Sequence, residues 1–143
     1  MTERATAVVS AGAAALLLAA SAAAGEVVRV QPGLWQSTTT VKSAFMPSLP
    51  PRTSTECIRQ AEYDVDKQLR DHGGCTITDK VVAGPTMRWT MTCSPAGGPV
   101  ATGEGELTSE ATRVDGRMRL TVRIQGQPLT THVTWTARRL GDC

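Results

Sequence analysis

Two histidines and a pair of glutamates are the side chains of this sequence that could support acid–base chemistry. His72 and His132 have no second histidine at a metal-ligand spacing such as H-x-x-x-H. Glu104 and Glu106 fall on one face of an expected strand, where two carboxylates could act as an acid and a base. Solvated surface side chains are the commoner reason for both patterns. We therefore predict no catalytic residue and no cofactor site, and we expect that the protein is not an enzyme.

The four cysteines could bind a metal, act as nucleophiles or form disulfides. Cys57, Cys75, Cys93 and Cys143 are separated by 18, 18 and 50 residues. Zinc sites need close pairs such as C-x-x-C, so we predict no metal site. An even number of cysteines in an oxidising compartment is typical of disulfides, here two, for which three pairings exist. Cysteines held in disulfides are not available as catalytic nucleophiles.

Arginines form the most distinctive surface of the expected sheet. In residues 112–124, "TRVDGRMRLTVRI", polar and apolar side chains alternate, so the arginines share one face. The candidate anion-binding face consists of Arg117, Arg119, Arg123 and, from the next strand, Arg138. A solvated, charged sheet face explains the same pattern. The functional hypothesis is an anionic partner: a phosphate-bearing polysaccharide, a lipid headgroup or an acidic protein surface. Aromatic residues do not interleave with the arginines, so nucleic acid is not predicted.

The N-terminal residues predict the compartment. Arg4 precedes an apolar run over 5–20, and Ala22 and Ala24 occupy the positions of an A-x-A cleavage site. This pattern predicts a signal peptide, residues 1–24, and a single periplasmic or secreted domain, residues 25–143. A membrane helix is the alternative, but the run is mostly alanine and short for a span. We expect no transmembrane segment in the mature protein.

Charge and composition restrict the function further. Fifteen Lys and Arg residues against thirteen Asp and Glu residues give a net charge of +2, which provides no whole-molecule attraction to nucleic acid or anionic membrane. Trp35, Trp89 and Trp135 fall in phase with apolar faces, so we expect all three in the core. A curved sheet lined by methionine, leucine and tryptophan could also hold a small apolar ligand, although a filled core is the commoner reason for such a face.

Alternating apolar and polar residues predict a mainly β protein. The proline-rich segment 43–54 is expected to be a loop. A 3-4-4 apolar spacing predicts one short helix near 60–70, stopped by a Gly-Gly pair. The sum is an antiparallel meander of about six strands, curled into a partial or closed barrel, with the helix after strand 1 and two disulfides. The expected strands cover 33–42, the two halves of 75–93, 100–108, 112–124 and 128–139.

Two hairpins set the expected register. A turn centred on Gly84 places Cys75 opposite Cys93, within disulfide reach, and leaves Cys57 for Cys143. The same turn predicts the pairs Ile77 with Met91 and Val81 with Met87. A turn at Gly126-Gln127 predicts the pairs Ile124 with Leu129, Leu120 with Val133, Met118 with Trp135, Arg119 with Thr134 and Thr121 with His132.

With these motifs in place, the chain resembles a family of small exported bacterial proteins known as domain of unknown function 3617. The resemblance rests on "PGLW" at 32–35, "CI" at 57–58, "GC" at 74–75, "RWTMTC" at 88–93, "ATGEGEL" at 101–107 and "RLGDC" at 139–143. The chain departs from the family at Gln36, where members often carry an acidic residue. The resemblance implies export and paired cysteines, and it implies no activity, cofactor or catalytic residue.

Two function classes follow. We expect an exported, periplasmic β protein that acts as a non-enzymatic envelope module and binds an amphipathic or anionic ligand or partner. Such a partner would be an amphipathic small molecule, an envelope polysaccharide or a protein. The alternative is a structural or assembly accessory protein of the cell envelope with no small-molecule ligand. An unfilled cavity of a few hundred Å3 would separate the two classes.

Overall fold

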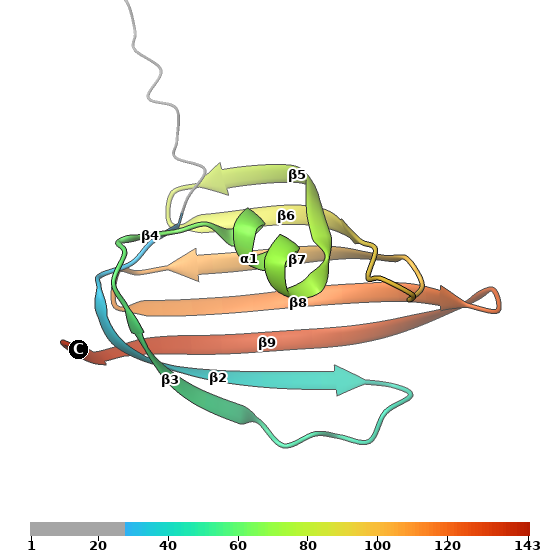
Figure 1. Ribbon diagram of the computed structural model, residues 1–143, viewed down its shortest axis with the longest axis horizontal. Coiled ribbons are helices and arrows are strands. Elements are labelled where there is room, and N and C mark those ends of the chain that lie inside the picture. The colour runs from blue at the N-terminus through green and yellow to red at the C-terminus, as the bar shows by residue number, and fades with distance from the viewer. Residues whose placement is uncertain (1–27) are drawn as a thin grey trace, which may run out of the picture.

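The computed structural model describes residues 28–143, so the expected signal peptide, residues 1–24, lies outside the described residues. The described chain is mainly β with one short helix (Figure 1). Its elements are β1 (Val28–Arg29), β2 (Gly33–Ser43), β3 (Arg52–Ile58), β4 (Glu62–Tyr63), α1 (Val65–Gly73), β5 (Cys75–Ala83), β6 (Thr86–Cys93), β7 (Ala101–Ser109), β8 (Arg113–Ile124) and β9 (Gln127–Gly141).

Seven of these strands form one antiparallel sheet in the order β3-β2-β9-β8-β7-β6-β5. Strands β5 to β9 are a meander, and the β2–β3 hairpin adds to the free side of β9 (Figure 1). Of the expected partial or closed barrel, the closed form is wrong: in the described chain, β3 and β5 are the two edges of the sheet and do not pair with each other. Closure is not needed to bury the apolar face, because α1 and the small β1–β4 sheet pack there instead.

The expected position of the helix is also wrong, since α1 follows β4 and not the first strand. The prolines of segment 43–54 end at Pro51, and "RTSTECI" directly after them is rich enough in β-branched residues to form the edge strand β3. The helix begins after Asp64, whose side chain accepts a hydrogen bond from the Lys67 backbone N–H at 3.0 Å. It ends at Gly73, and Gly74 is its left-handed C-cap, in agreement with the stop predicted from the Gly-Gly pair.

A bulge changes half of the β5–β6 hairpin. Cys75 faces Cys93 and Ile77 faces Met91, as expected, but the register shifts between Ile77 and Asp79. Val81 therefore faces Arg88 and not Met87, because the extra residue of a bulge moves every later side chain to the opposite face. This shift exposes Val81 and turns Lys80 towards α1, where its ammonium lies 2.9 Å from the Asp66 carboxylate.

In the β8–β9 hairpin, each side chain lies on the predicted face of the sheet, but the pairing register differs from the expected one by two residues. Gln125 and Gly126 both have positive φ, as a two-residue type I′ turn requires, so Ile124 pairs directly with Gln127. The expected turn at Gly126-Gln127 and its pairs are therefore wrong. A slip of two residues keeps each side chain on its predicted face. The observed pairs are Val122 with Leu129, Met118 with Val133, Gly116 with Trp135, Arg119 with His132 and Thr121 with Thr130.

The core lies between the sheet and the layer made by α1 and the β1–β4 pair. Trp35 and Trp89 are buried, and the Trp35 indole N–H donates to the Gln31 carbonyl at 2.9 Å. Trp135 is half-buried against this core, so the prediction of three core tryptophans holds fully for two. The buried side chains are Val28, Val30, Trp35, Val65, Cys75, Met87, Trp89, Met91, Cys93, Leu107 and Val114.

Both disulfides join the predicted partners. Cys75 and Cys93 are directly opposed on β5 and β6, and the bond between them is part of the core. Cys57 and Cys143 close a segment of 86 residues and fix the end of the chain to β3. The C-terminal residue is thus held in place covalently, beside the first long strand of the sheet. Among the described residues, no helix is long and apolar enough to cross a membrane.

Candidate functional site

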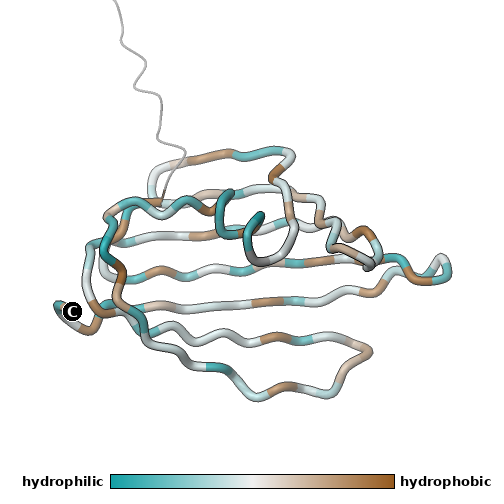
Figure 2. The backbone as a smooth tube through the Cα atoms, in the orientation of Figure 1, coloured by the Kyte–Doolittle hydropathy of each residue, from teal (hydrophilic) through white to brown (hydrophobic). Residues whose placement is uncertain are grey.

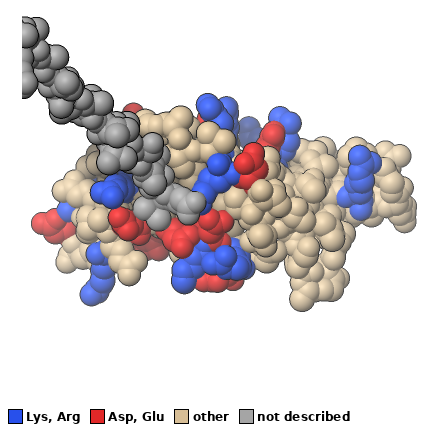
Figure 3. Space-filling model, turned by 90° about the horizontal axis from the view of Figure 1, so that it is seen from above, with Lys and Arg blue, Asp and Glu red and all other residues tan. Residues whose placement is uncertain are grey.

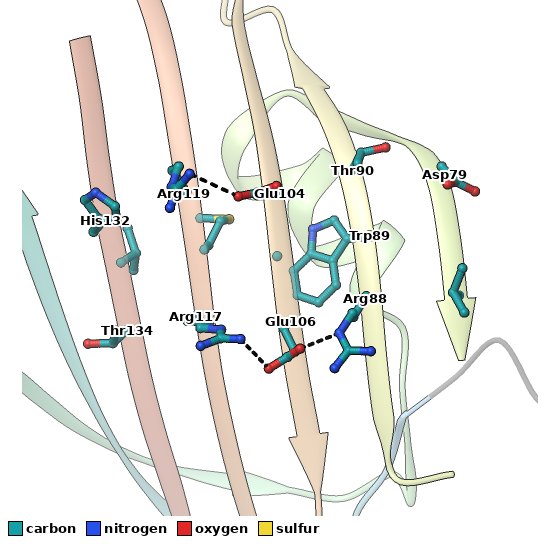
Figure 4. A pocket seen from close by; sticks show the side chains of 14 residues that line it. Asp79, Arg88, Trp89, Thr90, Glu104, Glu106, Arg117, Arg119, His132 and Thr134 are labelled. Carbon is teal, nitrogen blue, oxygen red and sulfur yellow. Dashed lines mark hydrogen bonds and ion pairs between the residues drawn. The ribbon is translucent and has the colours of Figure 1, made fainter. Parts of the chain in front are cut away.

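The face of the sheet opposite α1 is polar and hollowed, and we refer to it as the polar face. A groove of about 670 Å3 crosses it from β5 to β9 (Figure 4). Neighbouring strands are about 4.8 Å apart, so the groove is about 19 Å long across the strands. The side chains that enter it alternate along each strand with those of the core. They are Asp79, Val81, Arg88, Thr90, Glu104, Glu106, Arg117, Arg119, His132 and Thr134.

Arginines and glutamates pair across the strands of the groove. The Glu106 carboxylate accepts from the Arg88 guanidinium at 2.5 Å and lies 3.0 Å from that of Arg117, so it bridges β6 and β8 from its place on β7 (Figure 4). Arg119 lies 3.4 Å from Glu104 in the neighbouring row. The hydrogen bond from Arg88, assisted by the charge of Arg117, lowers the pKa of Glu106 below its ordinary value of 4.5.

The structure brings the predicted arginines together but does not leave them all free. Arg117, Arg119 and Arg123 share the polar face of β8, and Arg138 reaches it from β9. Arg117 and Arg119 form ion pairs with Glu106 and Glu104. The alternation of the sequence predicted one face for the arginines and one face for the glutamates, but it did not predict that they pair. Arg138 donates to the Gln36 side chain at 3.2 Å. Within residues 28–143, Arg123 and Arg138 have no ion pair.

Three basic residues of this face are outside the predicted site residues: Lys42, Arg88 and Arg113, the last of which is paired with Asp115. Arg88 belongs to the groove through Glu106, and Lys42 on β2 lies beside His132, which in turn faces Arg119. The pairing of β2 with β9 is a long-range contact, so no local pattern could have placed Lys42 there. His132 is exposed on the polar face, as expected, whereas the backbone of His72 lies in α1 and not in a loop.

Threonines fill the remainder of the polar face. Thr38 and Thr40 on β2 stand opposite Thr136 and Thr134 on β9, which makes a compact field of four hydroxyls. Thr53 on β3 extends it, with its hydroxyl 3.1 Å from that of Thr38. Lys42 and His132 border this field on one side, and Gln36 and Arg138 border it on the other. A hydroxyl both donates and accepts hydrogen bonds, so the field suits sugar or phosphate oxygens equally.

Arginines engage both glutamates of the groove. Glu106 is engaged by two arginines, which lower its pKa and favour its carboxylate form. In the described part of the chain, no group of three His, Cys, Asp or Glu side chains is placed to hold a metal ion.

A known protein family matches nearly all of the residues that the structure describes. The model of the family described as protein of unknown function, DUF3617, matches residues 30–143. The chain belongs to this family. No curated protein matches it, and no solved structure matches it. The matched range includes every strand of the seven-stranded sheet, α1 and both disulfides of this DUF3617 domain.

Proposed function

We propose that this DUF3617 protein is an exported, non-enzymatic module of the cell envelope that binds an anionic ligand on its polar face. The observation that carries the proposal is the charge of that face. Strands β2 and β5–β9 place seven basic side chains on it against four acidic ones. The basic residues are Lys42, Arg88, Arg113, Arg117, Arg119, Arg123 and Arg138, and the acidic residues are Asp79, Glu104, Glu106 and Asp115.

The arrangement of these charges favours an extended, hydroxyl-bearing ligand such as an acidic polysaccharide. Lys42, Arg123 and Arg138 carry the excess charge, since they have no ion pair among the described residues. Lys42 and Arg138 border the threonine field, and Arg123 lies on the same face of β8, four residues beyond Arg119 of the groove. Arginine, threonine and glutamate side chains in the groove together offer both donors and acceptors to ligand hydroxyls. The groove lies on the polar face of the sheet and not among the apolar side chains. It therefore favours an anionic ligand over a small apolar ligand.

Export belongs to the proposal and rests on two features. Residues 1–24 have the pattern of a signal peptide, and both disulfides favour an oxidising compartment. The test is the mass of the protein recovered from the periplasm or the medium of expressing bacteria. We expect a chain that begins near Gly25 and has no free thiol. Recovery of the full-length chain in the cytoplasm with four reduced cysteines would contradict export.

Ligand binding is tested with a soluble polyanion, dextran sulfate, against neutral dextran at low and physiological salt. We expect binding to dextran sulfate that weakens as salt rises, because exposed charges are screened beyond about 8–10 Å. The Lys42→Ala/Arg123→Ala/Arg138→Ala variant should lose it. The matched control is Arg29→Ala/Arg59→Ala/Arg70→Ala, which removes three arginines outside the polar face. Equal binding by the two triple variants would show that the polar face is not the site.

The second candidate, an accessory protein without a small ligand, is favoured by the ion pairs themselves. Arg88, Glu106 and Arg117 join three neighbouring strands, and such a ladder stabilises a sheet whether or not a ligand binds. The two candidates differ in the dextran sulfate experiment. Absence of salt-dependent binding by the unmodified protein would favour the accessory role.

A further inference from the structure

A surface distinct from the groove lies at the end of the sheet where the β2–β3, β6–β7 and β8–β9 connections are. These connections, residues 44–51, 94–100 and 125–126, project from the same end of the sheet (Figure 1). We refer to this end, with the adjoining strand termini, as the loop end. The opposite end holds the β5–β6 turn, the β7–β8 connection and the C-terminus.

Exposed apolar side chains gather at the loop end. Of the seven large hydrophobic residues that are exposed in the described chain, five lie there: Phe45 (47%), Met46 (44%), Leu49 (53%), Val100 (59%) and Ile124 (45%). Figure 2 shows the apolar colour at the β2–β3 loop and beside the β8–β9 turn. Scattered exposed apolar residues need no explanation, but five of seven at one end of a sheet mark a contact surface.

The three connections and the strand ends next to them carry charges of one sign only. Segments 42–52, 91–103 and 120–131 contain Lys42, Arg52 and Arg123, and they contain no Asp or Glu. The α1–β5 junction at the same end, where the Ser94 N–H donates to the Gly74 carbonyl, follows Arg70 and Asp71. In Figure 3, this end of the molecule, at the right, is mostly uncharged, and the charged side chains visible there are basic. Elsewhere on the molecule acidic and basic residues are mixed and paired, as in Arg88–Glu106 and Arg29–Glu62. A partner of this end must therefore offer an apolar interior and an anionic rim.

We propose that the loop end docks on an anionic lipid bilayer, with Phe45, Met46, Leu49 and Ile124 in the interfacial region and the three basic residues at the headgroups. Interfacial binding combines a buried apolar area with attraction to anionic lipids, and this end supplies both. The prolines of the β2–β3 loop, Pro47, Pro50 and Pro51, restrict its backbone, so little further ordering is needed on docking. The proposal does not depend on ligand binding in the groove.

The polar face stays accessible when the loop end faces the membrane. The groove runs across the strands, whereas the loops lie at the ends of those strands. A module docked in this way would stand upright on the lipid surface with the threonine field and the groove open to the aqueous side. Lys42 and Arg123 lie at the border between the two surfaces, since they are on the polar face near the strand ends.

The first test is co-sedimentation of the purified protein with phosphatidylglycerol/phosphatidylcholine vesicles and with pure phosphatidylcholine vesicles. We expect binding to the anionic vesicles, weaker at higher salt. The Phe45→Ser/Leu49→Ser variant should bind them about 10- to 100-fold more weakly, from the apolar area it removes. The Lys42→Gln/Arg52→Gln/Arg123→Gln variant should lose on the order of 100-fold, at about fivefold per basic residue.

The control is Leu140→Ser, which removes an exposed apolar residue that lies away from the loop end and outside the groove. We expect it to bind like the unmodified protein. All variants have the same N-terminus. If residues 1–24 were responsible for vesicle binding, all variants would bind equally, and that result would overturn the proposal. Unchanged thermal unfolding of each variant shows that lost binding is not lost folding. Dextran sulfate binding should be unaffected by Phe45→Ser/Leu49→Ser, which separates this proposal from the function of the groove.

A local reporter gives an independent reading. In Phe45→Trp, vesicle addition should shift the added tryptophan emission to the blue, whereas the same addition to Leu140→Trp should not. If the protein instead forms a dimer in solution that Phe45→Ser/Leu49→Ser dissociates, and vesicles do not shift Phe45→Trp, the loop end contacts a second copy of the chain and the membrane proposal is wrong.

Discussion

Trp135 on β9 covers Gly116, its directly opposed partner on β8, so closely that the indole occupies the space of a Cβ atom at that position. Trp89 on β6 has the same relationship with Gly105 on β7. Each indole ring thus lies over a glycine of the neighbouring strand. Because glycine has no side chain, the ring can pack on that strand without a clash. The glycines of "GEGEL" and "VDGRM" are part of the packing of the apolar face.

Gly116→Ala should therefore destabilise the protein by about 1–3 kcal/mol, because the added methyl group forces the indole out of its position. Urea unfolding followed by far-UV circular dichroism measures the free energy of unfolding. In a double-mutant cycle with Trp135→Phe, the smaller ring should relieve part of that cost, with a coupling of at least about 0.5 kcal/mol. Additive effects of the two substitutions would show that the ring and the glycine do not constrain each other.

Glu106 should titrate below its ordinary value of 4.5, because the Arg88 hydrogen bond and the charge of Arg117 favour the carboxylate. Its folded pKa is lower than its unfolded pKa, so its stabilising contribution is present above the unfolded pKa and is lost as pH falls through the folded pKa. Carboxyl carbon NMR measures the titration directly. In Arg88→Ala the pKa of Glu106 should rise towards 4.5, and a titration unchanged by that substitution would contradict the assigned cause.

Removal of the Cys57–Cys143 disulfide by Cys57→Ala/Cys143→Ala should lower the free energy of unfolding by about 2–5 kcal/mol, as for native disulfides in small secreted domains. The closed segment is 86 residues long, which makes the entropic effect on the unfolded chain large. The measurement is guanidinium unfolding of the oxidised proteins. Non-reducing peptide mapping of the unmodified chain provides the control, and a peptide joining Cys57 to Cys75 would show that the pairing is different.

Glu104→Gln/Glu106→Gln should strengthen binding of dextran sulfate, because it removes two negative charges and frees Arg117 and Arg119. Exposed ion pairs are weak, so the increase should reach about fivefold per glutamate at most. Binding isotherms at low salt measure it. Asp64→Asn/Asp66→Asn on the α1 side of the sheet is the charge-matched control, and an equal increase in that variant would indicate a general charge effect and not an effect of the groove.

The disulfides illustrate how local sequence predicts long-range structure. Cys75 and Cys93 flank two β-rich runs around a single turn, so hairpin geometry alone brings them together. Once they are paired, Cys57 and Cys143 have no other partner, although 86 residues separate them. The faces of β8 and β9 were equally predictable, since alternation fixes a face even when the register shifts by two residues.

The candidate site was less predictable. Alternation along β8 found Arg117, Arg119, Arg123 and, with β9, Arg138, because each strand carries its own period of two. It could not show that Glu104 and Glu106 neutralise two of them, because an ion pair between strands depends on register and rotamers. It also missed Lys42 and the threonine field, which exist because β2 returns to pair with β9.

The sequence by itself determined the class of structure, the sidedness of each long strand and the pairing of the cysteines, since these depend on residue type, period and turn position. The tertiary structure decided the rest. A bulge after Ile77 moved Val81 to the polar face, a type I′ turn at Gln125-Gly126 placed Trp135 over Gly116, and the position of the β2–β3 hairpin left the sheet open. Each of these outcomes is set by the relative free energies of alternative strand pairings, which depend on contacts between segments far apart in the chain and not on the pattern within any one of them.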